Sequence, residues 1–255
     1  MNRGTVVVHP DAATLATATA ARLLLHLIDA QCTHRPLHVV LTGGGLGTRV
    51  LAEVAGSPLR DAVDWTGVHL WWGDERFLPS GDPERNETQA RDALIERLPV
   101  PAVNVHPIPG PDAEGIDAPE DAAEAYATTL ASFASATPHS DDAGPSVPTF
   151  DVALLGVGPD GHIASLFPGH DTLEVTDRAV VGVHGSPKPP PERVSLTLPA
   201  LEAATEVWLV VAGGAKSEAV GRARAGDDVR RTPAAGARGR ARTLWLLDTD
   251  VAAER

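Results

Sequence analysis

The sequence predicts an α/β fold: a Rossmann-like open, mostly parallel sheet with helices on both faces and a small lid-like part. Two observations support this prediction. Over residues 4–107, apolar runs of strand length alternate with helical patterns, which is typical of a parallel sheet. Several apolar runs also end abruptly in glycine or charged residues. Open parallel sheets bind ligands in the crevice at the carboxyl ends of their strands, so these endings mark candidate site residues.

The elements follow one another along the whole chain. Strands are expected at residues 4–9, 37–41, 66–72, 103–107, 150–155, 178–184, 193–198, 206–212 and 242–247. Helices are expected at residues 11–31, 46–55, 86–97, 119–134 and 214–224. The strands within 193–212 could be antiparallel additions. Segments 135–148 and 225–240 are poor in apolar residues and are expected to be mobile, with the arginines of the second forming a solvated face.

Composition limits the class of protein. The chain has 255 residues, of which 43% are hydrophobic, and this suits a single α/β domain over residues 1–255. The formal net charge is −13, and no run of Lys and Arg is interleaved with aromatic residues. Nucleic acid and anionic membranes are therefore not expected as partners. A small molecule is the expected ligand.

Cysteine and histidine usage argues against a metal centre or a disulfide. Cys32 is the only cysteine, which excludes an intrachain disulfide and any site built from several cysteines. The ten histidines are dispersed without ligand spacing, so no metal is expected. No apolar run approaches the ~20 residues of a membrane span, and no signal sequence is visible. A cytoplasmic protein is expected.

The most informative motif is Gly-x-Gly-x-Asp-Gly-His at residues 156–162, directly after an apolar strand. Asp160 and His162 could form an acid–base unit, because a carboxylate that holds one imidazole nitrogen fixes which nitrogen can take a proton. The glycines also match a dinucleotide fingerprint, but a carboxylate in that turn would repel a pyrophosphate. A purely structural alternative has Asp160 capping a helix that begins near Ile163.

A second motif follows the strand at residues 37–41, where Thr42-Gly43-Gly44-Gly45-Leu46-Gly47 leads into a helix. Backbone amides can approach an anion closely in such a turn, and the helix amino terminus adds partial positive charge. The turn lacks a Gly-Lys-Ser/Thr ending and is not a nucleotide P-loop. A simple glycine-rich connection is the alternative.

Charged residues end the strand at 66–72. Arg76 can hold a phosphate in a bidentate manner. Asp74 and Glu75 could act as acid–base groups, but we favour the interpretation that they orient Arg76 through ion pairs. Asn86 is expected to cap the next helix and could also face the site.

Lys216 follows Gly213-Gly214 at an expected helix start. Cations are disfavoured there, so a lysine at this position suggests a bound anion, with simple solvent exposure as the alternative. Together with Arg76 and the turn at residues 42–45, Lys216 would form a phosphate cradle beside Asp160 and His162. This arrangement describes an enzyme that acts on a phosphorylated metabolite.

These residues resemble the 6-phosphogluconolactonases, which are related to the glucosamine-6-phosphate isomerases/deaminases. The resemblance spans nearly the whole chain and rests on Leu41-Thr42-Gly43-Gly44, Trp72 to Arg76, Gly156 to Pro168, Arg193-Val194-Ser195-Leu196-Thr197 and Gly213 to Lys216. It implies hydrolysis of 6-phosphoglucono-1,5-lactone in the oxidative pentose phosphate pathway, with no cofactor. The expected partner is this small phosphorylated sugar lactone, bound by a monomer.

The resemblance also implies roles for single residues. His162 would be the catalytic base, with Asp160 beside it. The substrate-binding residues would be Thr42, Gly43, Gly44, Gly45, Asp74, Arg76, Gly158, Arg193 and Lys216. Ser165 is expected within a helix and outside a Gly-x-Ser-x-Gly elbow, so a covalent acyl-enzyme is not expected.

Two other functions remain as alternatives. The related isomerases/deaminases resemble Asp-Gly-His-Ile-Ala-Phe-Asn-Glu-Pro, whereas this chain has Phe167 at the glutamate position. The loss of that carboxylate favours the lactonase, because ring opening needs more acid–base groups than lactone hydrolysis. A non-catalytic sugar-phosphate sensor would keep the cradle but would not need His162.

Overall fold

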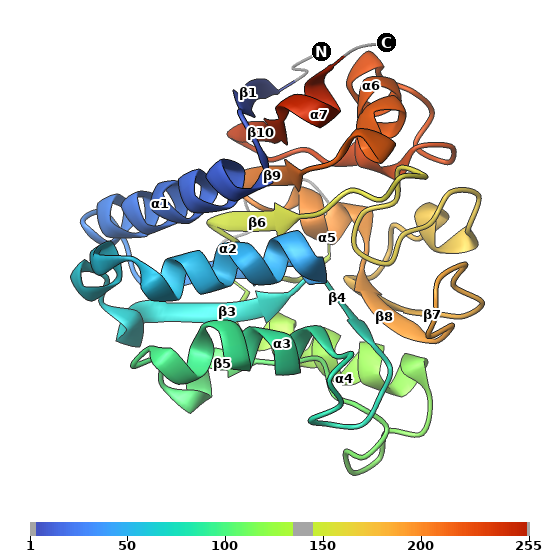
Figure 1. Ribbon diagram of the computed structural model, residues 1–255. Helices are drawn as coiled ribbons and strands as arrows, with labels where there is room; N and C mark the ends of the chain where they lie inside the picture. Colours follow the sequence, from blue (N-terminus) through green and yellow to red (C-terminus); the bar gives the residue numbers. More distant parts are fainter. Residues whose placement is uncertain (1–3, 135–144, 254–255) are drawn as a thin grey trace.

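The computed structural model describes residues 4–134 and 145–253, and its centre is a seven-stranded sheet (Figure 1). The strands are β1 (Thr5–His9), β2 (Leu37–Leu41), β3 (Val68–Trp72), β5 (Val105–His106), β6 (Val152–Leu155), β9 (Glu206–Val211) and β10 (Arg242–Asp248). They run in the order β1-β10-β9-β6-β2-β3-β5, and every pair is parallel. The expected fold class is confirmed.

Helices surround this sheet. They are α1 (Ala12–Gln31), α2 (Gly44–Gly56), α3 (Asn86–Ala93), α4 (Pro119–Ser132), α5 (Leu198–Glu202), α6 (Ser217–Ala225) and α7 (Thr249–Ala252). α1 and α2 pack side by side in front of the sheet in Figure 1, and α5 lies behind it. All five residues of β2 are buried, as expected for a strand covered on both faces.

A second, antiparallel sheet lies beyond the carboxyl ends of the central strands. It consists of β4 (Asp74–Arg76), β8 (Arg193–Leu196) and β7 (Val180–Val183), in the order β4-β8-β7. β8 is thus an antiparallel addition, whereas β9 belongs to the parallel sheet. Arg76 is paired in register with Arg193, so two expected site residues lie opposite each other.

Several expected boundaries were wrong. The helix expected at 86–97 ends at Ala93 and is followed by a 3-10 turn, Ile95–Arg97. Its cap is Arg85, and Asn86 is its first residue. The strand expected at 103–107 comprises only β5. No helix begins near Ile163, because residues 159–169 form turns and an isolated bridge.

The segment at 225–240 is ordered rather than mobile. It contains a 3-10 turn, Pro233–Gly236, and the side chains of Thr232 and Ala234 are at most 1% exposed. The backbone N–H of Ala234 donates to the carbonyl of Gly161 at 2.9 Å. The segment therefore packs against the Asp-Gly-His turn. Of the other segment expected to be mobile, residues 135–144 lie outside the described residues.

No helix among residues 4–134 and 145–253 is long and apolar enough to cross a membrane.

Candidate active site

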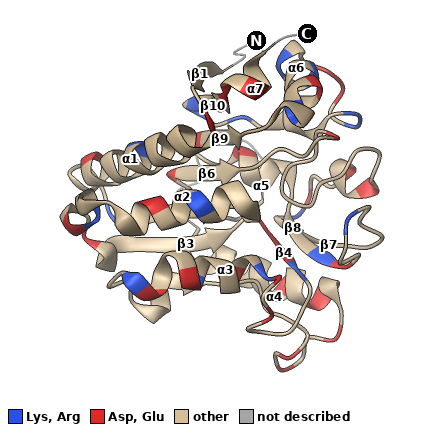
Figure 2. Cartoon of the chain, in the orientation of Figure 1, with Lys and Arg blue, Asp and Glu red and all other residues tan. Residues whose placement is uncertain are grey.

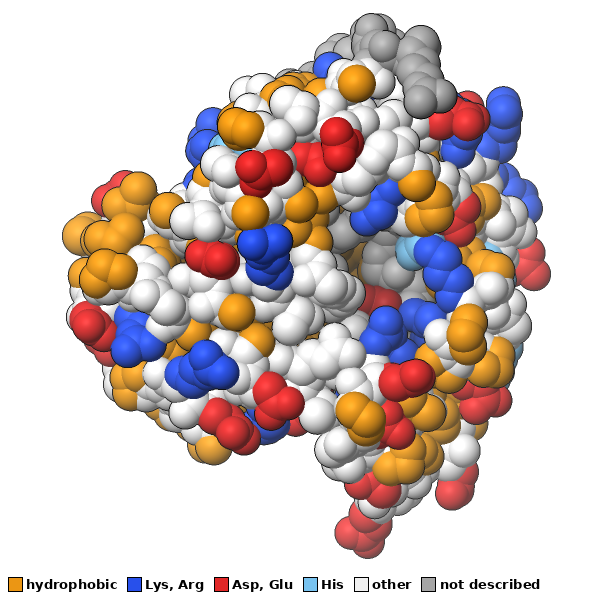
Figure 3. Space-filling view, in the orientation of Figure 1, with side chains coloured by type: hydrophobic (Ala, Val, Ile, Leu, Met, Phe, Trp, Pro, Cys, Tyr) orange, Lys and Arg blue, Asp and Glu red, His pale blue; other side chains and the backbone are white. Residues whose placement is uncertain are grey.

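A cavity of about 300 Å³ opens at the carboxyl ends of β2, β6 and β9, between the two sheets. Figure 3 shows this hollow with Lys, Arg and His side chains around it. Its lining residues are Thr42 to Gly47; Asp74, Arg76 and Asn86; Gly156 to Pro159 with His162 and Ala164; Lys188, Pro189 and Arg193; and Val210 and Lys216. All the predicted binding residues, together with His162, therefore line one cavity.

Asp160 and His162 form a hydrogen-bonded pair at the edge of this cavity. Nδ1 of His162 lies 2.5 Å from Oδ1 of Asp160, and the side chain of His162 is 16% exposed. Burial raises the pKa of Asp160, but the hydrogen bonds and charge of His162 outweigh this effect and bring that pKa to about 2. The carboxylate stays ionised at neutral pH and fixes the imidazole with Nε2 available to a ligand.

Gly158 is required by the close approach of this pair. A Cβ at Gly158 would lie 2.1 Å from Nδ1 of His162 and 2.5 Å from Oδ1 of Asp160. The backbone N–H of Gly158 also donates to the carbonyl of His162 at 2.9 Å. Gly158 therefore shapes the turn that holds the acid–base pair, besides lining the cavity.

A polar network centred on the buried Thr232 supports the turn from behind. Thr232 Oγ1 donates to Oδ2 of Asp227 at 2.8 Å and accepts from Nε of Arg222 at 3.2 Å. Arg222 also reaches the carbonyl of Asp160, at 3.5 Å. Gly161 has a φ of +93°, and a Cβ there would lie 2.8 Å from the methyl carbon of Thr232. The Asp-Gly-His turn is thus packed directly against this network.

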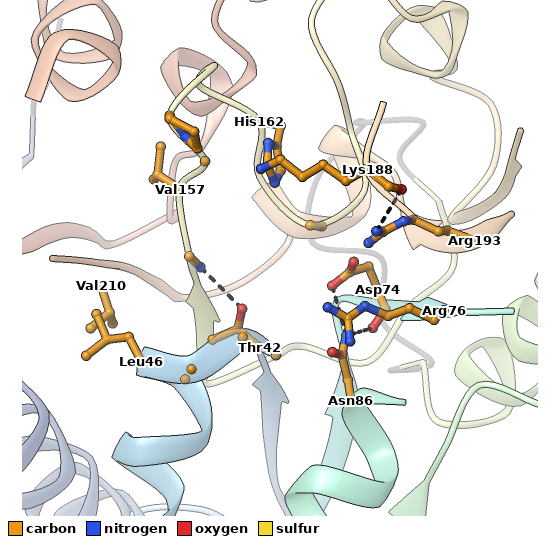
Figure 4. Close-up of a pocket in the computed structure, with 18 of the residues that line it drawn as sticks. Thr42, Leu46, Asp74, Arg76, Asn86, Val157, His162, Lys188, Arg193 and Val210 are labelled. Carbon is orange, nitrogen blue, oxygen red and sulfur yellow. Dashed lines mark hydrogen bonds between the residues drawn. The ribbon is translucent and has the colours of Figure 1, made fainter. Parts of the chain in front are cut away.

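The glycine-rich turn places a helix amino terminus in the cavity. α2 begins at Gly44, and its cap residue Gly43 makes no side-chain capping bond. Thr42 Oγ1 accepts from the backbone N–H of Gly156 at 3.2 Å, which joins this turn to the end of β6 (Figure 4). A Cβ at Gly43 would lie 1.9 Å from Oδ1 of Asn86, so only glycine fits. The first amides of α2 are available to an anion.

The prediction that Asp74 and Glu75 form ion pairs with Arg76 was wrong. Glu75 is buried and accepts from the backbone N–H groups of Arg76, Asn86 and Glu87 at 2.7–2.8 Å. It also lies 3.7 Å from Nε of Arg85. Burial raises the pKa of Glu75 to about 7, against the opposing effect of Arg85. The carboxylate of Glu75 therefore holds backbone N–H groups of β4 and α3 and does not orient the guanidinium of Arg76.

The guanidinium of Arg76 is held by the chain itself. It donates to the carbonyl of Glu84, and Nε is buried without a hydrogen-bond partner among the described residues. Arg76 lines the cavity opposite the glycine-rich turn (Figure 4). A guanidinium with an unused donor at this point suits a phosphate or carboxylate.

Asp74 interacts with a serine rather than with Arg76. Its Oδ2 accepts from Ser165 Oγ at 2.6 Å, and its carbonyl accepts from Nδ2 of Asn86 at 2.9 Å. Ser165 is fully buried in a turn, not in the expected helix. With its hydroxyl hydrogen bonded to Asp74 and no histidine among its partners, Ser165 is not arranged as a nucleophile.

The remaining cations come from the second sheet and from α6. Arg193 is buried, which lowers its pKa, and it donates to the carbonyls of Pro190, Lys188 and Pro189 at 3.0–3.2 Å. Burial and the nearby Lys188 lower the pKa of Lys216, the cap residue of α6. β4 is mostly acidic (red in Figure 2), and its one basic residue, Arg76, is paired with Arg193 of β8.

Two polar side chains of the cavity, those of Asn86 and Lys188, were not among those predicted to bind. Asn86 was noted as able to face the site, and it does: its Oδ1 is buried without a hydrogen-bond partner among the described residues. Lys188 gave no signal, because it lies in the proline-rich connection before β8 and belongs to no periodic pattern. No group of three metal-binding side chains occurs in the described part of the chain.

The comparisons with known proteins agree with this geometry. The model of the family described as glucosamine-6-phosphate isomerases/6-phosphogluconolactonase matches residues 10–245. The chain belongs to this family. A 6-phosphogluconolactonase of Streptomyces coelicolor is 54% identical over 98% of this chain and 94% of its own length. That of Mycobacterium tuberculosis is 45% identical over 98% and 97%.

Solved structures of relatives have the same fold. The 6-phosphogluconolactonase of Trypanosoma brucei has a TM-score of 0.81 at 30% identity, covering 98% of this chain and 97% of its own. A monomeric glucosamine-6-phosphate deaminase has a TM-score of 0.75 at 18% identity, covering 98% of this chain and 100% of its own. The second similarity shows the fold alone.

Proposed function

We propose that this protein hydrolyses 6-phospho-D-glucono-1,5-lactone to 6-phosphogluconate, with His162 as the general base. The observation that carries the proposal is the Asp160–His162 pair, whose Nε2 is free beside a cavity rich in cationic and amide donors. The high identity to proteins named 6-phosphogluconolactonase supports the substrate. The reaction belongs to the oxidative pentose phosphate pathway, and we propose a cytoplasmic monomer.

The chemistry needs one base and one acid, and a single imidazole supplies both. Nε2 of His162 takes a proton from water while the water oxygen bonds to the lactone carbonyl carbon. The bond from that carbon to the ring oxygen then breaks, and the imidazolium returns its proton to the departing oxygen. The carboxylic acid product ionises and releases one proton. Such acid–base catalysis contributes about 10²–10⁴-fold.

Phosphate binding would position the lactone for this step. The amino terminus of α2, Arg76 and Lys216 surround the cavity and match a phosphate dianion in charge. Arg193 adds a buried positive charge opposite Arg76. Binding energy from the phosphate would thus be used to place the carbonyl carbon near His162.

The isomerase/deaminase activity found in the same family is the weaker candidate. Phe167 occupies the position where that group has a glutamate, and its ring lies 4.8 Å from the imidazole of His162. It is buried and contacts Arg193 through its face at 5.8 Å. An apolar ring at this place supplies no further acid–base group beside the histidine.

Two substrates separate the candidates. Purified protein would be given freshly generated 6-phosphogluconolactone and, separately, glucosamine-6-phosphate. We expect lactone loss well above the spontaneous rate and no release of ammonia. Ammonia release without lactone hydrolysis would support the deaminase. Tight binding of 6-phosphogluconate without either reaction would support the sensor.

A further inference from the structure

The backbone of Lys188 is held by hydrogen bonds at both its N–H and its carbonyl. Ser186 Oγ accepts from the N–H of Lys188 at 3.2 Å and donates to its carbonyl at 2.8 Å. The guanidinium of Arg193 donates to the same carbonyl at 3.2 Å. The proline-rich connection between β7 and β8 is therefore fixed at the residue that enters the cavity.

The side chain of Lys188 is directed at the acid–base pair. It runs across the cavity toward His162 (Figure 4). Within residues 4–134 and 145–253, the hydrogen bonds of Lys188 all use its backbone, and its ammonium forms no ion pair. Its charge is nevertheless close enough to lower the pKa of both Asp160 and Lys216. Three unused N–H donors thus lie beside the site of proton transfer.

The other cations are better placed to bind phosphate. Arg76 and Arg193 are paired across two strands, and the charge of Arg76 contributes to the lowered pKa of Arg193, after burial. Arg76 and the glycine-rich turn face each other across the cavity (Figure 4). A planar guanidinium and a helix amino terminus suit a phosphate. The ammonium of Lys188, directed toward His162, then lies at the reacting end (Figure 4).

We propose that Lys188 is a catalytic residue whose ammonium donates a hydrogen bond to the lactone carbonyl oxygen and stabilises the oxyanion. The inference rests on the proposed function. When the water oxygen bonds to the carbonyl carbon, its proton goes to His162 and the carbonyl electron pair moves onto the oxygen that Lys188 holds. Lys188 keeps its protons throughout. When the ring bond breaks, the electron pair returns and re-forms the carbonyl.

The test is Lys188→Met, which keeps an unbranched apolar side chain as far as Cε and removes the charged ammonium. We expect kcat to fall by about 10²–10³-fold, as for the loss of one oxyanion donor, with KM changed less than about threefold. The inhibition constant of inorganic phosphate should stay unchanged, which also shows that the variant is folded. Lys188→Arg should restore part of kcat.

Arg76→Met is the matched control. It should weaken inhibition by inorganic phosphate and raise KM, with a smaller effect on kcat. If Lys188→Met instead raised KM and the phosphate inhibition constant while kcat stayed normal, Lys188 would be a phosphate ligand and the inference would be wrong. If the unmodified protein did not accelerate lactone loss, the proposed function itself would fall, and the inference with it.

Discussion

Nδ1 of His162 lies 2.5 Å from Oδ1 of Asp160, and a Cβ on Gly158 would lie 2.1 Å from the same nitrogen. The acid–base pair and the glycine that accommodates it are therefore a single tightly packed unit. Because Nδ1 is hydrogen bonded to a carboxylate, Nε2 is the nitrogen that faces a ligand. The function proposed for His162 depends on this tautomer.

Replacing Asp160 should disturb the tautomer more than the fold. In Asp160→Asn, the amide can donate to Nδ1, which places the proton on Nε2 and removes the base. We expect kcat to fall by about 10²–10⁴-fold with KM little changed. Since the pKa of Asp160 is about 2, its carboxylate is ionised from pH 4 upward. Steady-state kinetics would check this, and an unchanged kcat would contradict it.

A methyl group at position 158 should displace the imidazole. In Gly158→Ala, the new Cβ overlaps the ring of His162, and a misplacement of about 1 Å can cost 10²-fold in rate. The matched control is Gly221→Ala, because a Cβ at Gly221 in α6 meets nothing within 4 Å. We expect the control to keep its activity. Equal activities of the two variants would argue against the constraint.

The network behind the turn offers a test of positioning. Thr232→Val keeps the shape but removes the hydroxyl between Arg222 and Asp227. Thr232 is fully buried, and the loss of the two hydrogen bonds of its hydroxyl should lower the free energy of unfolding by about 1 kcal/mol. We also expect a lower kcat without a matching rise in KM, and recovery of both quantities in Thr232→Ser. A serine variant as impaired as the valine variant would refute the role of the hydroxyl.

Stability should depend on pH through a buried histidine far from the cavity. Burial lowers the pKa of His106 to about 4, and its ring stacks on Trp71 at 3.9 Å and bonds to His69 at 2.9 Å. Below about pH 6.5 the unfolded chain binds a proton there that the folded protein does not bind. The stability from this group is therefore complete above pH 6.5 and is lost as pH falls toward 4.

The variant His106→Phe isolates this effect, because it keeps an aromatic ring on Trp71 but cannot titrate. At pH 7.5 the variant should be less stable than the unmodified protein, because phenylalanine cannot form the hydrogen bond to His69. The difference in free energy of unfolding between the two proteins should be about 2 kcal/mol smaller at pH 5 than at pH 7.5. The unmodified protein loses about 1.4 kcal/mol for each pH unit below the unfolded pKa of about 6.5. Urea unfolding of both proteins at pH 7.5 and pH 5 measures this difference. An equal difference at the two pH values would show that His106 has the same pKa in the folded and unfolded states.

The elements predicted from the sequence are those whose own residues show a helix or strand pattern. β2 was predicted at residues 37–41 because it is an apolar run of strand length, and the helical pattern at 11–31 corresponds to α1, which the structure shows capped by Asp11 with a bond of 2.7 Å from the N–H of Thr14. β4 was missed, because its three polar residues form a strand only by pairing with β8, far along the chain.

In the candidate site as well, residues within a local motif were predicted, and a residue brought in by the tertiary fold was missed. Asp160 and His162 lie within one motif, and their pairing follows from local geometry. Lys188 was missed because only the tertiary fold brings the proline-rich connection across the cavity. The segment around Thr232 was taken as mobile because few of its residues are apolar, yet it is ordered through polar bonds to Arg222 and Asp227.

The most direct test of the central claim is the loss of freshly generated 6-phosphogluconolactone at pH 7, measured with the unmodified protein and with His162→Gln and corrected for spontaneous hydrolysis. We predict rapid loss with the unmodified protein and a rate about 10²–10⁴-fold lower with the variant, while inorganic phosphate inhibits both equally well. A variant as fast as the unmodified protein would contradict the assignment of His162 as the base.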